Sequence, residues 1–464
     1  MVFNGEKANF DHKKIYFFLY FFDFMFYTNK NLKEDFIMIK VGVLGAYRGT
    51  SMINYCIASK NKAKVVAICD KNSEVLERQK AAHGAEDITY YENFDDFINH
   101  DMDAVVLANY ATEHAPFAVQ CLKRGLHVFS EVLPCQTMKE AVELIEAVEK
   151  SGKVYAYGEN YCYMPTVMEM KRLYKQGKIG EIEYGEGEYI HNCESIWASI
   201  TYGERDHWRN NMYATFYCTH SIGPLIHICE LKPVSVVGFE SSMTERKLRN
   251  GAKSGLFGIE MITLENGAIL KSIHGDLYKD SVWYSVYGGK GRIESGRADS
   301  GKSETLYVNA DNYCGEYPSE SRTTSYEPAV KNGVVEYFGH GGSDYYIMDN
   351  FIDKLCGKEE ADIIDVYEAM DMFLPGMFAY RSVLQGGISV QIPNLRDKSV
   401  RDKFREDTAC TDPNVAKDRL LPVYSKGTPD IPDEIYEIVK NKWEKERADG
   451  QYVKAVMKQG DIRR

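Results

Sequence analysis

The sequence lacks several features that mark common classes of protein. Its eleven cysteines form no Cys-x-x-Cys pair and no Cys/His cluster at the spacing of zinc ligands, so we expect no metal site. An odd and scattered set of cysteines is typical of reduced thiols, which indicates a cytoplasmic protein. The formal net charge is −12, and without a basic excess we expect neither nucleic acid nor a membrane as a partner.

Long apolar runs are also absent, with one short exception near the start of the chain. Residues 15–27 are almost all aromatic or aliphatic, but the run is too short for a transmembrane helix and contains Asp23. Two lysines precede it as in a signal peptide, yet no small-residue cleavage site follows. Residues 1–37 are therefore a signal, an anchor, or an extension that is disordered or not native. We expect the extension, because a strand begins directly at Met38.

Short apolar strands alternate with helices from Met38 to about Tyr157. Strands of this kind are buried on both faces, as in a parallel sheet that helices cover. The expected strands are Lys40–Leu44, Val65–Cys69, Ala104–Ala108, His127–Ser130 and Val154–Tyr157. A capping box at Thr137–Glu140 begins the helix after the fourth strand, and Gly152 ends it.

The turn after the first strand lacks two of the three glycines of a dinucleotide-binding loop. Tyr47 and Thr50 stand where the second and third glycines of G-x-G-x-x-G are usual. Asp70 follows the second strand, where an acid binds the ribose hydroxyls and favours NAD over NADP. Strand, turn, helix and acid together predict a dinucleotide site, with the pyrophosphate at the helix N-terminus. The expected contacts here are Gly45, Tyr47, Arg48, Gly49 and Asp70.

Beyond Tyr157, alternating aromatic-rich segments are separated by Gly, Asn, Asp and Lys. This pattern predicts hairpins in a mostly antiparallel sheet. The expected strands are Glu181–His191, Val234–Ser241, Leu256–Leu264, Ala268–Gly275 and Val282–Tyr287. Helices are expected over 165–177, 343–355, 366–384 and near 433–458, and loop over 296–332.

These patterns predict an α/β protein of two domains, since 464 residues exceed what one hydrophobic core usually holds. We expect a doubly wound Rossmann domain over residues 38–158 and an α/β domain with an open, mostly antiparallel sheet over 159–395. Residues 396–464 are expected to form a charged tail with a peripheral helix. An exposed aromatic-rich sheet is an association hazard, so we expect a homo-oligomer, a dimer or tetramer, formed through it.

The domain order and two motifs resemble the Gfo/Idh/MocA oxidoreductases over about residues 38–395. Val105–His114 is similar to that family's strand and loop ending in His, and Gly125–Glu131 to the strand that follows. Most members continue Glu-Lys-Pro, with the lysine in proton transfer at the sugar hydroxyl. This chain has Val132, which cannot exchange a proton, so another group replaces that lysine or the activity differs. Further cofactor contacts are expected at Asn109, His114 and Glu131.

Four further segments are similar to motifs of one subgroup, the NAD-dependent α-N-acetylgalactosaminidases of glycoside hydrolase family 109 and their relatives, which also lack the lysine. They are Glu159–Tyr163, Gly187–His191, Tyr217–Pro224 and Gly339–Tyr345. The resemblance implies a resident NAD that takes a hydride from a sugar carbon and returns it. Between those events the C2 proton and the C1 substituent leave and water adds. It implies catalytic positions at Glu159, Tyr189 and His220, without implying a sugar specificity.

His220 is the residue that we expect to move protons, because an imidazole exchanges them near neutral pH, although a packing role is an alternative. Tyr217, three residues earlier, would share its helical face and bind the reacting hydroxyl, or line the sheet. Glu159 follows the last parallel strand, at the edge where such sheets bind ligands. It could accept the C2 proton, bind a sugar or cap a helix, and Tyr189 could assist departure at C1.

Other polar residues have weaker claims. His227 lies seven residues after His220, but no third ligand supports a metal pair. Asp206–Arg209 offers charged and stacking groups for a sugar or forms a surface turn. His340 and Asp344 shape the pocket wall or cap the helix after them.

We therefore expect an NAD-dependent oxidoreductase that acts on a small sugar or glycoside. Two enzyme functions compete: oxidation to a ketosugar with net NADH formation, and redox-neutral glycoside cleavage with NAD recycled. Val132 and the motifs around Glu159, Tyr189 and His220 favour a glycoside. A catalytically silent NAD- or sugar-binding sensor is the third alternative, because the family's usual lysine is missing.

Overall fold

The computed structural model describes residues 38–59, 61–84, 86–297, 304–310, 323–329 and 338–449. The predicted extension over 1–37 and the last part of the predicted helix near 433–458 lie outside these residues. Across the described ranges, no helix is both long and apolar enough to cross a membrane.

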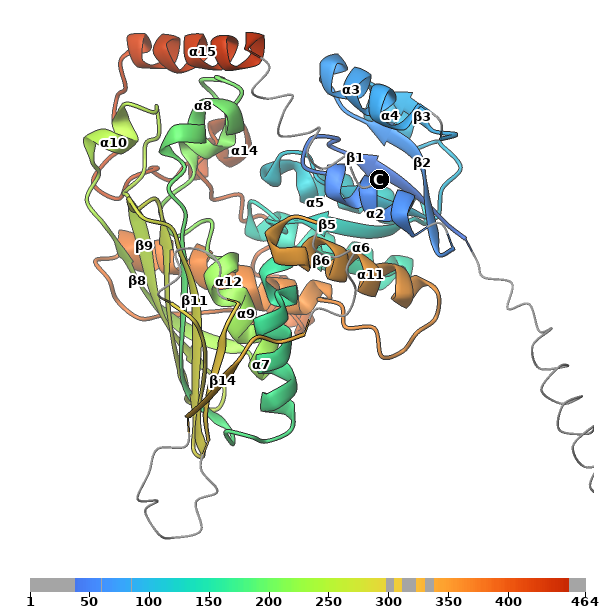
Figure 1. Ribbon diagram of the computed structural model, residues 1–464. Coiled ribbons are helices and arrows are strands. Elements are labelled where there is room, and N and C mark those ends of the chain that lie inside the picture. Colours follow the sequence, from blue (N-terminus) through green and yellow to red (C-terminus); the bar gives the residue numbers. More distant parts are fainter. Residues whose placement is uncertain are drawn as a thin grey trace, which may run out of the picture. The chain divides into compact units, whose positions relative to one another are not determined.

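Six parallel strands form the first sheet, in the order β3-β2-β1-β4-β5-β6 (Figure 1). They are β1 (Ile39–Leu44), β2 (Ala63–Cys69), β3 (Thr89–Tyr91), β4 (Ala104–Leu107), β5 (His127–Glu131) and β6 (Tyr155–Gly158). The helices between them are α2 (Thr50–Ala58), α3 (Ser73–His83), α4 (Phe94–Phe97), α5 (His114–Lys123) and α6 (Met138–Ser151). This is the doubly wound order, which confirms the predicted Rossmann sheet. The edge strand β3 was not predicted, because it has only three residues.

The predicted capping box begins α6. Thr137 Oγ1 accepts a hydrogen bond from Glu140 N at 3.1 Å, and Glu140 Oε2 accepts one from Gln136 N at 2.6 Å. Gly152 ends the helix at φ +63°. Both ends of α6 are therefore fixed by the local sequence.

Nine strands form the second sheet, in the order β14-β13-β12-β11-β7-β10-β9-β8-β15. They are β7 (Ile182–Ile190), β8 (Pro233–Glu240), β9 (Phe257–Leu264), β10 (Ile269–Gly275), β11 (Ser281–Gly288), β12 (Gly291–Ser295), β13 (Leu306–Ala310), β14 (Thr323–Tyr326) and β15 (Val390–Gln391). Strands β7 and β10 pair in parallel and the other described pairs are antiparallel, as predicted.

The expected loop over 296–332 was wrong in part, because β13 and β14 lie within it. All four residues of β14 are exposed, and in β13 only Leu306 and Val308 are buried. Short edge strands with so few buried residues leave no apolar pattern in the sequence.

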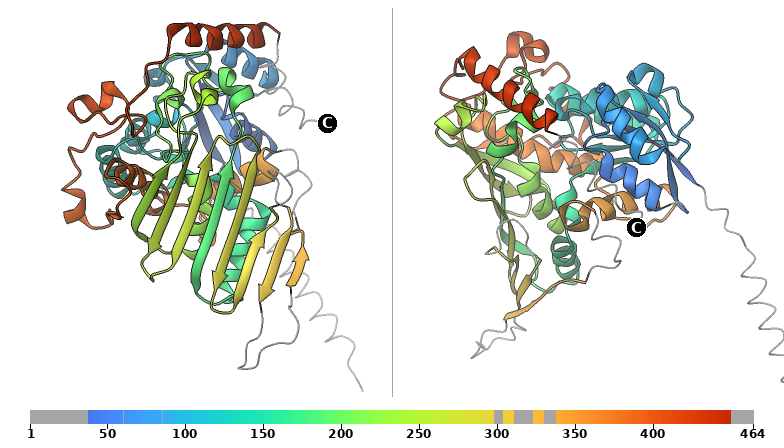
Figure 2. Two further views of the ribbon diagram at one scale, coloured as in Figure 1. Left: turned by 90° about the vertical axis from the view of Figure 1, so that its left-hand side faces the viewer. Right: turned by 45° about the horizontal axis from the view of Figure 1, so that its top comes forward.

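Helices α7 (Pro165–Lys175), α9 (Thr219–Cys229) and α12 (Val366–Leu384) pack on one face of this sheet. The left view of Figure 2 looks onto the opposite face, along which the described strands carry no helix. The sheet is therefore open, as predicted, while assembly through that face stays a prediction. Helix α11 (Ser343–Leu355) packs against α2 and the 3₁₀ turn Asn160–Tyr163.

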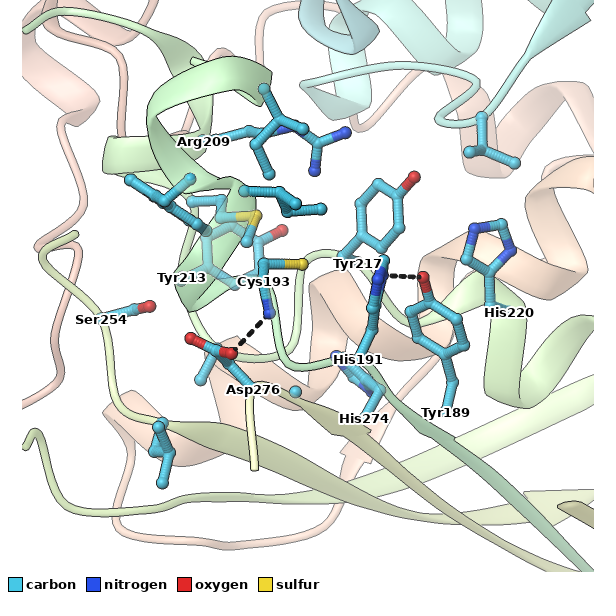
Figure 3. Close-up of a pocket in the computed structure, with 18 of the residues that line it drawn as sticks. Tyr189, His191, Cys193, Arg209, Tyr213, Tyr217, His220, Ser254, His274 and Asp276 are labelled. Atoms are coloured by element: carbon cyan, nitrogen blue, oxygen red, sulfur yellow. Dashed lines mark hydrogen bonds between the residues drawn. The ribbon is translucent and has the colours of Figure 1, made fainter. Parts of the chain in front are cut away.

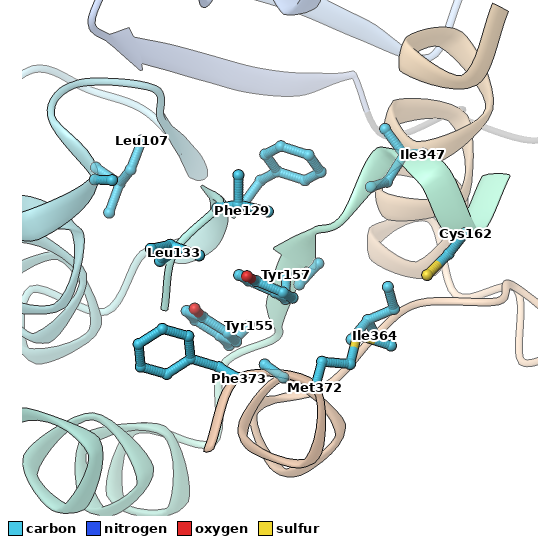
Figure 4. Close-up of a cluster of buried hydrophobic side chains, with 14 of the residues drawn as sticks. Leu107, Phe129, Leu133, Tyr155, Tyr157, Cys162, Ile347, Ile364, Met372 and Phe373 are labelled. Carbon is cyan, nitrogen blue, oxygen red and sulfur yellow. The ribbon is translucent and has the colours of Figure 1, made fainter. Parts of the chain in front are cut away.

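A buried apolar cluster joins the first sheet to these helices (Figure 4). Leu107 of β4, Phe129 of β5 and Tyr157 of β6 face Ile347 of α11 and Phe373 of α12, and all five are buried. Backbone pairing supports the same join, because Tyr157 N donates to Ile364 O at 2.8 Å. The carboxyl ends of the parallel strands are therefore held in place by the second half of the chain.

The last described segments pack back onto both halves. Helices α13 (Lys398–Arg401) and α14 (Pro413–Ala416) follow β15, and the fully buried Arg401 pairs with Glu149 of α6 at 2.9 Å. Helix α15 (Asp433–Ala448) lies against α8 (Trp197–Ile200), with Trp443 buried.

Candidate active site

A cleft of about 990 Å³ lies at the carboxyl ends of β1, β2, β4 and β5. The predicted cofactor contacts that line it are Gly45, Tyr47, Arg48, Asp70, Asn109 and Glu131. Gly49 does not line it but closes the turn, since its N–H donates to Gly45 O at 2.9 Å. The first-sheet motifs therefore converge on one edge, where open α/β sheets bind their ligands.

The turn of this cleft fits a dinucleotide. Gly45 has φ +88°, and a Cβ there would overlap the carbonyl of Ala108, so only glycine leaves this approach open. No side chain of the described residues caps the N-terminus of α2, although Gly49 N, Thr50 N and Met52 N already donate to backbone carbonyls of the turn. The buried Oδ1 of Asn109 lacks a hydrogen-bond partner among the described residues.

Asp70 has a second role that its position in the sequence does not indicate. Its Oδ2 accepts from Ala46 N at 2.8 Å and its Oδ1 from Asn72 N at 2.9 Å, so the carboxylate holds the turn. Burial raises its pKa, and these two backbone hydrogen bonds oppose that shift. Contact with a ribose stays a prediction.

The structure does not bring His114 to the cleft. Its Nδ1 lies 3.0 Å from Leu133 O, inside the protein, and burial lowers the pKa of the imidazole to about 4. A neutral, buried ring at this position supports the segment after β5. The sequence places His114 at the start of a helix but does not show which way its side chain packs.

Arg48 links the two halves of the site. Its guanidinium donates to both oxygens of Asp344, at 3.0 and 3.1 Å, and lies 2.8 Å from Glu131 Oε1. Asp344 is fully buried and also accepts from Asn160 Nδ2 at 2.9 Å. Burial would raise the pKa of Asp344, but Arg48 and His340 hold it well below its usual value.

The same effect of burial is only partly compensated at Glu131. It raises the pKa of this carboxyl to about 7, although Arg48 opposes the shift.

A second cavity of about 230 Å³ adjoins the cleft (Figure 3). The two share six lining residues, namely Arg48, Glu131, Val132, Ile200, Arg209 and Tyr217. Its volume is below the 300–1,000 Å³ usual for ligand pockets, so it suits a small ligand. Of the predicted catalytic residues, His220, Tyr189 and Tyr217 line it and Glu159 does not.

Glu159 lies directly behind His220. Its Oε1 is 2.6 Å from His220 Nδ1 and also accepts from Tyr161 N at 3.2 Å. Glu159 is fully buried, and a Cβ on Gly223 of α9 would lie only 2.8 Å from its Cγ. The glycine therefore lets the carboxylate reach the imidazole. A carboxylate at Nδ1 fixes the tautomer and leaves Nε2 for a ligand.

Three tyrosine rings surround the imidazole of His220. The ring centroids of Tyr161, Tyr189 and Tyr217 lie 4.4, 4.7 and 5.1 Å from it. Tyr189 Oη lies 3.1 Å from His191 Nδ1, a contact drawn in Figure 3. Burial raises the pKa of Tyr189 and of Tyr217, so both phenols stay protonated at neutral pH and can donate hydrogen bonds.

The segment 206–209 contributes unevenly. The Arg209 guanidinium lies 4.4 Å from the ring centroid of Trp208 and 5.3 Å from that of Tyr217, on the wall between cleft and cavity. His207 lines the cleft, and burial lowers its pKa to about 3. Asp206 lines neither space.

Several cavity residues had no signal strong enough to identify them from the sequence. His191 ends the motif Gly187–His191, but Lys247, His274 and Asp276 belong to no motif. The sequence offered one signal. In β9 and β10 every second residue is buried and is usually apolar, but Glu260 and His274 stand at two of these positions.

No group of three His, Cys, Asp or Glu residues in the described ranges is arranged to hold a metal ion. His227 does not pair with His220. Its Nδ1 lies 2.7 Å from Glu368 and its Nε2 2.9 Å from Lys171, in a separate buried network.

Residues 39–159 match the family model described as oxidoreductase family, NAD-binding Rossmann fold. The chain is 26% identical over 400 residues to a glycosyl hydrolase family 109 protein 2 from Shewanella sp. (strain MR-4), covering 77% of this chain and 85% of that protein. It is 30% identical over 200 residues to a glycosyl hydrolase family 109 protein from Saccharopolyspora erythraea, covering 40% and 43%.

Solved structures agree on the fold. A levoglucosan dehydrogenase in complex with NADH and L-sorbose has a TM-score of 0.64 at 16% identity, over 77% of this chain and all of that one. A myo-inositol 2-dehydrogenase from Lactobacillus plantarum has a TM-score of 0.60 at 19% identity, over 76% and 99%. Residues 39–159 therefore match the NAD-binding Rossmann-fold model of the Gfo/Idh/MocA oxidoreductases, and over most of its length the chain is similar to proteins named glycosyl hydrolase family 109.

Proposed function

We propose that this protein uses NAD to cleave a glycoside without net oxidation or reduction. The observation that carries the proposal is His220, which Glu159 holds from behind and which lines a small cavity whose wall is shared with the NAD cleft. The family's usual lysine is Val132 here, and His220 lines the same cavity as Val132. The relatives named glycosyl hydrolase family 109 support a glycoside as the substrate class.

The turn at Gly45, the N-terminus of α2 and Asn109 would hold the dinucleotide, with Asp70 beside them. When bound, NAD supplies reversible hydride transfer at a sugar carbon, and the resulting ketone makes the neighbouring C–H acidic. The protein's own task is then to move protons at fixed positions.

His220 is the acid/base of the proposed reaction. With Nδ1 directed at Glu159, its Nε2 takes a proton from the sugar and gives it back. Glu159 does not line the cavity, so we assign it a positioning role and not the direct contact with the sugar that was one alternative from the sequence. Tyr217 and Tyr189 stay protonated and donate hydrogen bonds to the sugar oxygens, Tyr189 at the departing group.

The test is turnover of chromogenic glycosides and free sugars with NAD⁺ in deuterated buffer. The proposal expects release of the aglycone without net NADH, and deuterium at C2 of the product sugar. NADH accumulation without aglycone release would instead identify a sugar dehydrogenase, and two of the similar structures are named dehydrogenases, of myo-inositol and of levoglucosan. Cofactor binding with no turnover of either kind would identify a sensor.

A further inference from the structure

One end of the small cavity carries charged side chains that the proposed chemistry does not use. In Figure 3, Asp276 and Ser254 lie on the side away from His220, with His274 between the two sides. Lys247 lines the same cavity, and its Nζ lies 3.7 Å from Asp276 Oδ2. We name Lys247, Ser254 and Asp276 the distal end.

The charges of the distal end are buried but incompletely bonded. Lys247 and Asp276 are only 3% and 5% exposed, and 3.7 Å is too long for a hydrogen bond between them. Asp276 Oδ1 accepts from Cys193 N at 2.9 Å, whereas its Oδ2 lacks a hydrogen-bond partner among the described residues. A buried polar atom left unbonded costs about 1–3 kcal/mol, which a ligand that bonds it recovers.

The surrounding structure holds Lys247 and Asp276 in place through contacts other than hydrogen bonds to Lys247 Nζ or Asp276 Oδ2. Lys247 lies in α10 (Glu245–Leu248), and the preceding Arg246 ties this helix to Glu194 at 2.9 Å and Asn192 at 2.8 Å. Asp276 directly follows β10 and is held by the bond from Cys193. The distal end is therefore preorganised, which is the condition for selective binding.

The chemistry of this end suits hydroxyl groups better than an anion. An ammonium donates and a carboxylate oxygen accepts, and a pair of sugar hydroxyls needs both. An anion would meet the carboxylate of Asp276, which lines the cavity. Trp197, whose ring centroid lies 5.1 Å from Lys247 Nζ, adds an aromatic wall of the kind that packs on a sugar ring.

We propose that Lys247 and Asp276 bind the hydroxyls on the sugar edge opposite to the reacting carbons, so that the substrate is a neutral hexopyranoside with free hydroxyls at C4 and C6. The assignment of ring positions rests on the proposed function, in which C1 to C3 react beside His220. Sugar acids and sugar phosphates are excluded as preferred ligands by the same pair.

The test measures binding and not turnover, so it is separate from the cleavage assay. NMR titration of the NAD-loaded protein compares D-glucose and D-galactose with their 4-deoxy and 6-deoxy analogues and with the two uronates. One parent hexose is expected to bind about tenfold or more tightly than its deoxy analogues, because each analogue leaves a buried polar group unpaired. Comparing sugars on the unaltered protein avoids any effect of a substitution on folding.

The variants Lys247→Met and Asp276→Asn then complete a thermodynamic cycle, in which the side chain and the sugar hydroxyl are removed separately and together. Each variant is expected to bind the parent hexose about tenfold more weakly and to bind the deoxy analogues as well as the parent. Removing the hydroxyl or removing its partner side chain breaks the same hydrogen bond, so making both changes costs no more than making one. Lys253→Met is the matched control, because Lys253 is bonded to Asn211 at 2.8 Å and lines no part of the cavity.

Three results would overturn the inference: no binding of either hexose, equal binding of parent and deoxy sugars, or tighter binding of a uronate. The inference would also be overturned if the losses of affinity caused by the variant and by the deoxy sugar were independent, so that together they multiplied. Hexose binding with the expected cycle but without glycoside cleavage would leave this inference standing and remove the proposed function.

Discussion

The contact between Glu159 and His220 is the feature on which the proposed proton transfer most depends. Replacing the carboxylate by an amide, Glu159→Gln, keeps the volume but removes the charge that orients and stabilises the imidazolium. We expect kcat to fall about a hundredfold, as for His220→Ala. NAD affinity should not change, because neither side chain lines the cleft.

The split between kcat and KM distinguishes positioning from a merely structural role. Glu159→Gln keeps the volume behind His220 but not the charge, so it should lower kcat with little change in KM or Tm. His100→Ala is the control, since His100 bonds the Tyr91 hydroxyl at 2.9 Å and lines neither space. An unchanged kcat in Glu159→Gln would remove Glu159 from the mechanism.

The sequence motifs locate the reacting end of the cavity better than its distal end. Tyr189 comes from one motif, and Tyr217 and His220 come from another. All three line one cavity, because a strand end and a helix N-terminus bring the two motifs together. The burial of Glu159 depends on the close approach of α9 at Gly223, which no local pattern shows. Lys247, from a four-residue helix, meets Asp276 only through tertiary packing.

At the scale of elements, α15 spans the mouth of the NAD cleft. Figure 1 shows it running from above α8 towards α3. Trp443 and Arg447 line the cleft, Trp443 packs edge-on against Tyr202 at 5.6 Å, and Arg447 pairs with Glu74 of α3. The last described helix therefore connects two sides of the cofactor site.

Arg447→Ala should speed the release of NAD. An exposed ion pair contributes about 0–1 kcal/mol, so the dissociation rate should rise about two- to fivefold, with little change in Tm. Stopped-flow displacement of NADH measures it, and the difference should shrink in high salt. Arg405→Ala is the matched control, because Arg405 pairs with Glu146 and is similarly exposed but does not line the cleft. Equal release rates for wild type and Arg447→Ala would show that this contact does not restrain the cofactor.

Helices and strands with a regular pattern of apolar residues were predictable from the sequence, and short strands at the sheet edges were not. The strands of the parallel sheet are apolar on both faces, and the predicted helices over 343–355 and 366–384 match α11 and α12. The two-residue strand β15 and the exposed β14 gain their conformation from a neighbouring strand alone. Pairing partners of this kind are set by the whole sheet, and a local window of sequence does not contain them.

At the scale of the whole molecule, the buried carboxyls and the buried histidines change the free energy of unfolding in opposite directions as the pH rises. Burial raises the pKa of Glu131 and Glu140 to about 7 and that of Asp371 to about 6. These carboxyls bind more protons when folded than unfolded, so their effect is a loss of stability as pH rises from about 4.5 to about 7. Burial lowers the pKa of His114 and His207, and their effect has the opposite sign and is complete above about pH 6.5.

Glu140→Gln isolates one of these terms. Glutamine keeps the oxygen that accepts from Gln136 N, but it cannot ionise. At pH 5 the folded wild type already holds Glu140 neutral, so the two proteins should have similar stability. At pH 8 the wild type must bury a charge, and the variant should be the more stable by about 1–3 kcal/mol. Urea unfolding at the two pH values measures this, and because the histidines are common to both proteins their contribution cancels. A variant that is equally or less stable at pH 8 would show that the carboxylate of Glu140 is well solvated at the start of α6.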